Sequence, residues 1–482
     1  MLTAIEIENF KGFGKRQRID LAQITLLFGA NSAGKSSFLH ALFFLRDVFA
    51  TERANFEHLK FFSNSIDLGG FENVVHNHDK SSEILFRLEF SVSSDEHAPF
   101  KLTRGDFDLA DFSFEIELAF SVSDSDSPLV HHFGLSLAGE KALDLFVLNP
   151  REDSDSKVKL TAEMKVLNEM MINFPNHCQE WDATRVFELP MNQVLFPLRG
   201  AFPLASKFES TSPPFDDNDD TCEILDYCQS IFKAYIDYSK ECLNDFLYIG
   251  PLREVPPDSY QASRRIPTAR WATGLAAWDE LHLSQNEKRV QLLSETNRWL
   301  ERMGVGVKVV IGPDLIAHHD SGFPANVSVR VVPLFKEESM SPSLRVQDVG
   351  CGVAQLTPVI VAMLLDRRKT VLIEQPELHL HPRLQTELGD LLLSTCDDHS
   401  HAIIETHSEH LILRLLRRIR ETNEEDLPEG VPRVFPMDVA VQYFQTSVNG
   451  TLVKRLRISD EGEFIDAWPF GFFDERIGEM YG

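Results

Sequence analysis

The sequence predicts an α/β fold with a central parallel sheet, an antiparallel β lobe and a mainly helical insertion. Three short apolar segments, at 24–28, 370–373 and 402–404, end at polar residues and are each followed by a helical pattern. This alternation of strand and helix is typical of a parallel sheet. Two other segments, at 84–90 and 112–118, alternate apolar and polar residues, as strands of an antiparallel sheet do.

Composition limits the classes of protein to which the chain can belong. Its 482 residues, 43% of them hydrophobic, suffice for a large core and roughly three average domains. The formal net charge of −27 argues against a protein that coats nucleic acid through bulk electrostatics, and leaves a local basic patch open. Six dispersed cysteines form no metal-type pair, so we expect reduced thiols and a cytoplasmic location. The apolar region 353–365 is too short to cross a bilayer, and no membrane partner is expected.

Residues 29–36 have the pattern of a phosphate-binding loop, in which Gly and four further residues precede Gly-Lys-Ser. An apolar strand comes before the loop, and apolar residues at helical spacing follow it from Phe38 to Leu45. This is the context that such a loop requires. Glycines let the backbone approach phosphate oxygens, and the amides of the first helical turn point toward the anion.

The loop therefore predicts a site for ATP and Mg²⁺. We expect Lys35 to contact the β- and γ-phosphates and the Ser36 hydroxyl to bind Mg²⁺. The alternative is a glycine turn before an ordinary helix, which the complete pattern disfavours. The expected binding residues of the loop are Gly29, Ala30, Asn31, Ser32, Ala33, Gly34, Lys35, Ser36 and Ser37.

Residues 1–150 are expected to form an N-terminal lobe that contains this loop. Residues 4–8 alternate as a half-exposed strand does, and the segments 133–138 and 142–147 indicate a hairpin around Gly139. We therefore expect an antiparallel lobe beside the nucleotide site.

Residues 151–300 are expected to form the mainly helical insertion. Acidic and serine-rich linkers interrupt this part of the chain, and the segment 224–246 has apolar residues at helical spacing. Residues 248–253 indicate a return to the core, as a short strand and a turn that bears Arg253. A basic cluster is interpreted as a solvated loop in preference to a phosphate contact; it consists of Arg264, Arg265 and Arg270.

Residues 301–482 are expected to form a C-terminal lobe with a second set of functional residues. A glycine turn at Gly350 and Gly352 enters a helix, and the apolar strand after it ends at Glu374. A carboxylate in that place suits Mg²⁺, and a second carboxylate can orient an attacking water. Another strand ends near His407, whose imidazole can bond a γ-phosphate. Because ligands bind beyond the carboxyl ends of parallel strands, we expect these residues and the phosphate loop to share one nucleotide.

Several of these residues also have plainer interpretations. Gly350 and Gly352 can form a simple turn, and His407 can be a structural histidine. His379 and His381 can suggest metal ligands, but we interpret them as residues that cap and pack the following helix.

The motifs resemble those of the ABC-type ATPases of the SMC, RecF and overcoming-lysogenization-defect (OLD) group, which are P-loop NTPases. Residues 7–11 look like the opening strand of that group, residues 374–382 like its Walker B motif, and Thr406-His407-Ser408 like its switch histidine. Residues 350–355 stand where its signature motif belongs. The closing segment 469–474 resembles a branch of bacterial AAA-type proteins with a Gly-Phe-Phe-Asp motif. The resemblance implies an ABC-type ATPase head whose catalytic residues are Lys35, Glu374, Gln375, Glu377 and His407, with Ser36 and Glu374 at the metal.

The chain departs from the pattern of this group in two places. Glu374-Gln375 replaces the usual Asp-Glu. Gln375 cannot take a proton and so cannot act as a general base, which makes Glu377 the substitute to test first. The signature also lacks its usual serine and has Ala354 near that place.

The resemblance implies an ATPase that forms a homodimer or higher homo-oligomer when ATP binds. It further implies a role in bacterial DNA maintenance or phage defence, with a separate effector protein. The net charge leaves DNA open as a partner, because the arginines at 414–420 can form a local basic patch. The alternative is an ATP-gated scaffold that hydrolyses little and holds a toxin or effector subunit; a small-molecule kinase fits less well. Only about 75 residues follow His407, too few for an added domain of typical size, so no nuclease module is expected.

Overall fold

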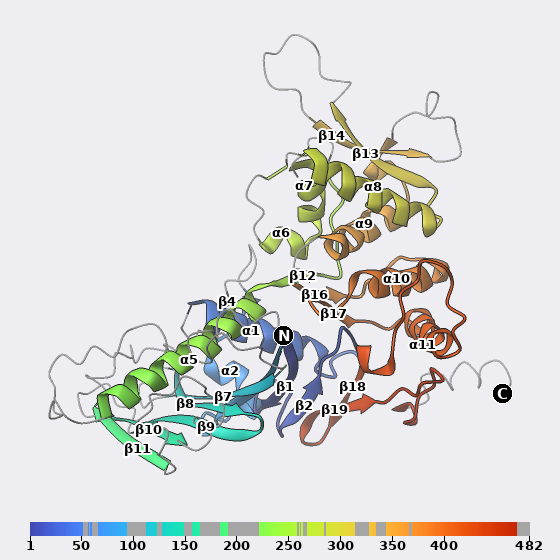
Figure 1. The fold of residues 1–482 in the computed structure, drawn as a ribbon. Coiled ribbons are helices and arrows are strands. Elements are labelled where there is room, and N and C mark those ends of the chain that lie inside the picture. The colour runs from blue at the N-terminus through green and yellow to red at the C-terminus, as the bar shows by residue number, and fades with distance from the viewer. Residues whose placement is uncertain are drawn as a thin grey trace, which may run out of the picture.

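The computed structural model describes residues 1–51, 56, 58–59, 66–93, 112–122, 128–148, 157–163, 184–190, 221–257, 260, 262–263, 268–283, 286–313, 327–333, 344–365 and 369–469. Two sheets and the helices around them make up most of this part of the chain (Figure 1).

A six-stranded sheet lies at the centre and confirms the predicted parallel core. Its strand order is β12, β16, β17, β3, β18, β19; the first five strands run parallel, and β19 pairs antiparallel with β18. The ends of β16 and β17 therefore lie at the same edge as the end of β3. The strands are β3 (Ile24–Gly29), β12 (Phe246–Ile249), β16 (Lys369–Glu374), β17 (Ser400–Glu405), β18 (Val439–Ser447) and β19 (Gly450–Leu456).

Both faces of this sheet are buried, which explains why its strands read as continuous apolar runs. Leu27 faces a core that it shares with helix α1 (Lys35–Thr51), whereas Leu26 faces a second core on the opposite side. That second core includes apolar residues of α9 (Cys351–Leu364), α10 (Pro382–Thr395) and α11 (Glu409–Asn423).

An eight-stranded antiparallel sheet packs against α1 on the side away from the parallel sheet. Its order is β11, β10, β9, β8, β7, β6, β1, β2. The predicted hairpin is present, because β8 and β9 pair across a turn in which Ala138 and Gly139 both have positive φ. The strands are β1 (Leu2–Glu8), β2 (Gln17–Asp20), β6 (Ile84–Val92), β7 (Phe112–Val122), β8 (Pro128–Leu137), β9 (Glu140–Leu148), β10 (Lys157–Glu163) and β11 (Thr184–Pro190).

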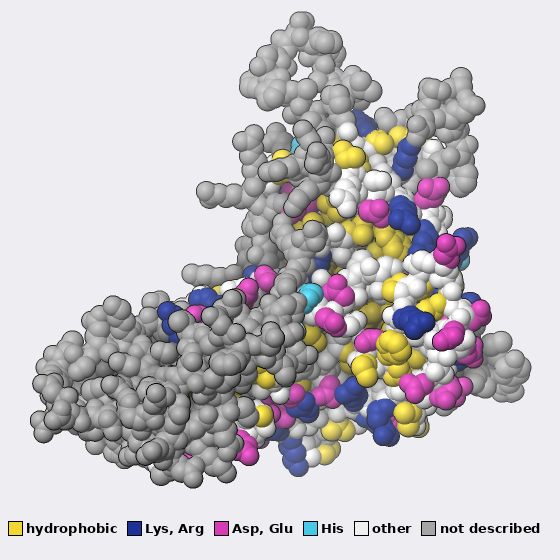
Figure 2. All heavy atoms as spheres, in the orientation of Figure 1, with side chains coloured by type: hydrophobic (Ala, Val, Ile, Leu, Met, Phe, Trp, Pro, Cys, Tyr) yellow, Lys and Arg dark blue, Asp and Glu magenta, His cyan; other side chains and the backbone are white. Residues whose placement is uncertain are grey.

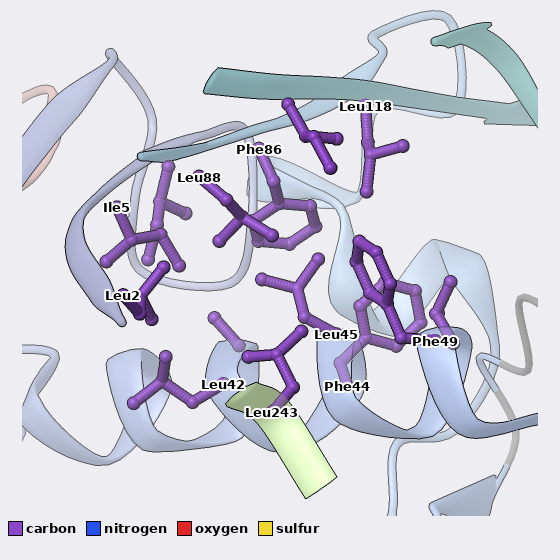
Figure 3. Packing of buried hydrophobic residues seen from close by; sticks show 14 of the residues in the cluster. Leu2, Ile5, Leu42, Phe44, Leu45, Phe49, Phe86, Leu88, Leu118 and Leu243 are labelled. Carbon is purple, nitrogen blue, oxygen red and sulfur yellow. The ribbon is translucent and has the colours of Figure 1, made fainter. Parts of the chain in front are cut away.

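The core between α1 and this sheet is rich in aromatic residues (Figure 3). Phe44 of α1 contacts Phe86 of β6 and Phe120 of β7, with ring centroids 5.8 and 5.3 Å apart. Leu243, near the end of α5 (Thr221–Asn244), lies in the same cluster. Burial of this kind is the main favourable term for folding, and here it fixes the helix that begins at the phosphate loop.

The segment 151–300 holds strands as well as the predicted helices. Strands β10 and β11 extend the antiparallel sheet, α5 runs along it, and β12 then joins the parallel sheet beside β16. This confirms the predicted return to the core at residues 248–253. The division of the chain at residues 150 and 300 stays a prediction.

The remaining elements form a lobe around α9. They are α6 (Thr268–Ala272), α7 (Leu275–Leu283), α8 (Asn286–Arg302) and the three-stranded sheet of β13 (Val307–Pro313), β14 (Val327–Pro333) and β15 (Leu344–Arg345). The Asn297 side chain joins α8 to β13, because it accepts from Val309 N at 2.7 Å and donates to Val309 O at 2.8 Å. Minor elements are β4 (His58–Leu59), β5 (Ile66–Asp67), α2 (Phe71–Val74) and the 3-10 turns η1 (His76–His78), η3 (Val346–Asp348) and η4 (Pro436–Asp438).

Two segments singled out in the sequence lie partly or wholly outside the described residues. Arg270 of the basic cluster forms an ion pair with the buried Asp279 at 2.5 Å, and Arg264 and Arg265 lie outside the described residues. The Gly-Phe-Phe-Asp segment also lies outside them. In the part of the chain that the structure describes, no helix is long and apolar enough to cross a membrane.

The expected basic patch on α11 is not a set of free cations, because three of its four arginines pair with carboxylates. The fourth, Arg420, donates to the main-chain oxygen of Glu461 at 2.9 Å. Arg418 binds both oxygens of Asp390 at 2.9 Å, and Arg414 also binds Asp390, at 2.8 Å. Arg417 pairs with Glu421 at 2.6 Å. Acidic and basic side chains accordingly alternate over the face where α10 and α11 lie (Figure 2). A motif read along one helix misses the carboxylates that the neighbouring helix supplies.

Asp390 generates a prediction about stability, because it is 1% exposed and also binds Arg302 of α8 at 2.9 Å. Burial opposes its ionisation, but the hydrogen bonds from Arg418 and the charges of the arginines hold the pKa of Asp390 below its usual value. Asp390→Asn should lower the free energy of unfolding by about 3–5 kcal/mol, because it removes the buried charge that Arg302, Arg414 and Arg418 share and leaves Arg418 with Glu421 alone. Urea denaturation measures this.

The matched control is Glu295→Gln, which breaks the exposed pair with Arg298 and should cost less than about 1 kcal/mol. Equal effects of the two substitutions would contradict the role given to the Asp390 cluster, which consists of Asp390 and the three arginines that bind it, Arg302, Arg414 and Arg418.

Candidate nucleotide-binding site

The phosphate loop joins the end of β3 to the start of α1, and its geometry requires glycine at two positions. Gly29 has φ +138°, and a Cβ there would lie 2.1 Å from the Phe444 carbonyl oxygen. Gly34 has φ +109°, and a Cβ there would lie 2.3 Å from Thr451 Oγ1. Both residues therefore need the freedom and the small size of glycine, as the sequence predicted.

Lys35 lies under the loop. Its ammonium donates to the carbonyl oxygens of Gly29 and Ala30 at 2.9 and 3.0 Å, and it lies 3.6 Å from Glu405 Oε1. The side chain is 3% exposed, and this burial lowers the pKa of Lys35, while the charge of Glu405 opposes the shift. The loop thus surrounds the Lys35 ammonium, whose positive charge can pair with an anionic ligand.

The other loop residues divide into supporting and accessible positions. Ala33 and Gly34 are buried, Gly29 and Ser37 are half-buried, and four residues are exposed: Ala30, Asn31, Ser32 and Ser36. The Ser36 hydroxyl is therefore available to a ligand at the first turn of α1.

Glu374, the last residue of β16, is held by β12 and by the turn that follows it. Tyr248 donates its hydroxyl to Glu374 Oε1 at 2.6 Å, and Arg253 Nη2 donates to the main-chain oxygen of Glu374 at 2.8 Å. Burial raises the pKa of Glu374, although the Tyr248 hydrogen bond and the charges of Arg253 and Lys35 oppose the rise. The structure therefore places this carboxylate near the cation of the loop.

Glu405 is a site residue that the sequence reasoning missed. It ends β17 and pairs in register with Glu374, the last residue of the neighbouring strand. Its Oε1 faces Lys35, whereas its buried Oε2 has no hydrogen-bond partner among the described residues. Burial raises the pKa of Glu405, as does the charge of Glu374, and Lys35 opposes both. The available signal was its place at the strand end, the place that singled out Glu374.

Glu377 and Gln375 form hydrogen bonds with the end of β17 and with the two residues that follow it. Both oxygens of Glu377 accept hydrogen bonds, one from His407 N at 2.6 Å and one from Thr406 Oγ1 at 2.9 Å. Gln375 has φ +43° and donates its main-chain N–H to the main-chain oxygen of Glu405 at 2.7 Å. In this arrangement Glu377 joins the segments after β16 and β17, and its role as a base stays a prediction.

His407 lies half-buried in the same cluster. Burial lowers the pKa of His407, and the positive charge of Lys35 lowers it further. The imidazole is therefore neutral at pH 7, a form in which one ring nitrogen donates and the other accepts.

The signature glycines lie at the first turn of α9. Gly350 is exposed, and a Cβ there would meet no atom of the described residues within 4 Å; the nearest of their atoms to a Cβ on Gly352 is Leu380 Cδ2 at 3.9 Å. In the part of the chain that the structure describes, no packing requires glycine at these positions. Gln355, one turn later, donates to the main-chain oxygen of Arg253 at 2.9 Å and so connects α9 to the turn that holds Glu374.

The two histidines after Glu377 behave differently. His381 caps α10, because its ring accepts from Arg383 N at 3.3 Å, as predicted. His379 is exposed and has φ +62°. Within the described residues, no group of three or more His, Cys, Asp or Glu side chains is arranged to hold a metal ion.

The oxygens at the site nevertheless fit a metal that arrives with phosphate. Mg²⁺ prefers hard oxygen ligands, and it is usually held by one or two protein oxygens together with phosphates and water. The exposed Ser36 hydroxyl and the Glu374 carboxylate supply such oxygens. A complete protein cage is not needed for this use.

Comparison with known proteins identifies the family to which the chain is similar. The family model described as AAA ATPase domain matches residues 1–249 and 284–412. A comparison with the curated proteins gave no match. Among solved structures, the chain is similar to an Smc head bound to the C-terminal winged-helix domain of ScpA, at 11% identity and a TM-score of 0.42, with 95% of this chain and 98% of that chain covered.

Two further Smc heads show the same level of similarity. The SMC head domain from Thermotoga maritima is 10% identical, with a TM-score of 0.37 and coverage of 95% and 99%. The Smc head bound to the C-terminal domain of ScpA from Pyrococcus furiosus is 10% identical, with a TM-score of 0.38 and coverage of 95% and 96%. The family match spans both the phosphate loop and the strand that ends at Glu374, and the chain therefore belongs to the AAA ATPase domain family.

Proposed function

We propose that this protein binds MgATP at the common edge of β3, β16 and β17 and hydrolyses it. One observation supports this most strongly: Lys35 of the phosphate loop forms an ion pair with Glu405, the register partner of Glu374. The ends of β3, β16 and β17, which lie far apart in the sequence, thus meet near one cation, as the sequence pattern of strand ends predicts.

Each side chain has a role in this proposal. Lys35 binds the β- and γ-phosphates, and Ser36 and Glu374 are the residues that would hold Mg²⁺. When bound, the metal neutralises charge on the phosphates. The neutral His407 offers a hydrogen bond near the γ-phosphate.

Two carboxylates are candidates for the group that accepts the proton of the attacking water. Glu377 is the candidate from the sequence, but its oxygens are already bonded to His407 N and Thr406 Oγ1. Glu405 has one buried oxygen without a partner among the described residues, and its raised pKa makes it a stronger base than an ordinary carboxylate. We therefore favour Glu405, with Glu377 as the residue that positions the loop of His407.

Closure of two chains around ATP completes the proposal. The exposed Gly350, where a Cβ would meet no atom of the described residues within 4 Å, provides a surface on which the nucleotide of a second subunit can rest. ATP would then favour a homodimer, and hydrolysis would release it. Smc heads are named in complex with a separate protein, ScpA; an effector partner in DNA maintenance or phage defence is the corresponding proposal here. The paired arginines of α11 favour a protein partner over direct DNA contact through that helix.

A second candidate function is an ATP-gated scaffold that hydrolyses little. The uncharged Gln375 and the bonded oxygens of Glu377 favour it, because together they leave the positions after Glu374 without a free base. Steady-state turnover with MgATP distinguishes the two: a scaffold binds ATP tightly with near-zero turnover.

Lys35→Ala should weaken ATP binding by about 100-fold or more, because it removes a buried charge that contacts phosphate. Isothermal titration calorimetry with MgATP measures the loss. Lys454→Ala removes an exposed lysine of β19 and should leave the affinity unchanged. Unaltered binding by Lys35→Ala would show that the nucleotide site lies elsewhere.

Glu405→Gln should reduce turnover at saturating MgATP by about 100-fold or more, the usual contribution of a general base. Phosphate release measures this, with Glu377→Gln in parallel. Because burial raises the pKa of Glu405, the ionised base is lost as pH falls, so the wild-type rate should fall toward acid from a higher pH than an ordinary carboxylate would give. A larger loss for Glu377→Gln, with Glu405→Gln near wild type, would return the role of base to Glu377.

Gly350→Leu should leave the monomer folded and able to bind ATP, since its φ of −53° suits any residue and no atom of the described residues lies within 4 Å of the added Cβ. It should abolish ATP-dependent dimerisation in the hydrolysis-slow Glu405→Gln background. Mass photometry or light scattering with and without ATP measures the assembly. An unchanged dimer would place the subunit interface away from α9.

A further inference from the structure

Arg253 is a buried cation with unused hydrogen-bond donors. Its side chain follows β12 and is 4% exposed. Nη2 donates to the main-chain oxygen of Glu374 at 2.8 Å and lies 3.5 Å from that of Gln375. Nε and Nη1 are buried and have no hydrogen-bond partner among the described residues. A guanidinium has five N–H donors, and buried donors without partners are rare because they lose their hydration without compensation.

The position of Arg253 is fixed from both sides. Gln355 of α9 donates to its main-chain oxygen at 2.9 Å, and Gly274 packs against it so closely that a Cβ there would lie 3.3 Å from Arg253 Cβ. Burial lowers the pKa of Arg253 to about 10, against the opposing charges of Glu377 and Glu374. The group therefore remains charged at pH 7, and the structure keeps its free donors in place.

Arg253 lies at the edge of the sheet where the phosphates are expected, because its Nη2 bonds the main-chain oxygen of Glu374, the last residue of β16. In the sheet order, β17 separates β16 from β3, and neighbouring strands are about 4.8 Å apart. A triphosphate that starts at the phosphate loop and extends toward β16 brings its last phosphate nearest to Arg253. Charge-assisted bonds to phosphate oxygens are the strong interactions that a guanidinium forms.

We propose that Arg253 is a second phosphate-binding cation of the site and that its Nε and Nη1 groups bind the terminal phosphate of ATP. This inference rests on the proposed function and deepens it. Lys35 holds the nucleotide at the end of β3, whereas Arg253 recognises the group by which ATP differs from ADP. Because Gln355 of α9 bonds the main-chain oxygen of Arg253, the same residue connects the terminal phosphate to the surface proposed for closure.

The test compares the affinities of Mg-AMP-PNP and Mg-ADP by calorimetry in the full-length protein. Wild type should bind the triphosphate analogue at least about tenfold more tightly. Arg253→Lys and Arg253→Gln should weaken analogue binding by about 10- to 100-fold, the loss expected for hydrogen bonds to a charged group, and should change ADP binding by less than about twofold. Arg298→Lys, at an exposed arginine of α8, is the matched control and should change neither affinity.

The outcomes separate this inference from the function on which it rests. Parallel losses of ADP and analogue binding would show that Arg253 only holds Glu374 in place, and unchanged affinities would show that it has no role; either result overturns the inference. Equal affinities of wild type for ADP and the analogue overturn it too, even when neither substitution at Arg253 gives a folded protein by circular dichroism. Wild type that binds neither nucleotide would instead refute the proposed function.

Discussion

The ion pair between Lys35 and Glu405 is the interaction on which the site depends. It joins the helix after β3 to the end of β17, and both partners are less than one-tenth exposed. Glu374 lies beside Glu405 in register, and the charges of both carboxylates act on the Lys35 cation. Burial raises the pKa values of Glu374 and Glu405 because it removes water from both carboxylates, and the charge of Glu374 adds to the rise at Glu405. A bound divalent cation relieves this repulsion, and the cluster therefore favours a ligand that brings metal and phosphate together.

The rest of the fold holds these strand ends in place. The parallel sheet is buried on both faces, by α1 with the antiparallel sheet on one side and by α9, α10 and α11 on the other. A displaced strand would therefore cost core packing as well as hydrogen bonds. The Asp390 cluster fastens α8, α10 and α11 together, and the bond from Tyr248 of β12 keeps Glu374 directed toward the site. Stability and the proposed chemistry thus depend on the same layers.

The sequence predicted those parts of the site that are encoded locally. The phosphate loop, the strand that ends at Glu374 and the segment of His407 each show in a few consecutive residues. Glu405, Tyr248 and Arg253 take their roles from strand register and from contacts between residues more than a hundred positions apart, which no local pattern contains. The patch of free cations predicted for α11 failed partly for the same reason, because Arg414 and Arg418 pair with Asp390 of another helix. Strands β10 and β11 were not recognised because acidic linkers separate them from the lobe that they extend.

The most direct test of this account is a crystal structure with AMP-PNP and Mn²⁺ in place of Mg²⁺, since manganese is located by its anomalous scattering. The account predicts the phosphates against Lys35 and the anomalous peak between Ser36 and Glu374. A nucleotide bound away from the ends of β3, β16 and β17, or a metal that contacts neither Ser36 nor Glu374, would contradict it.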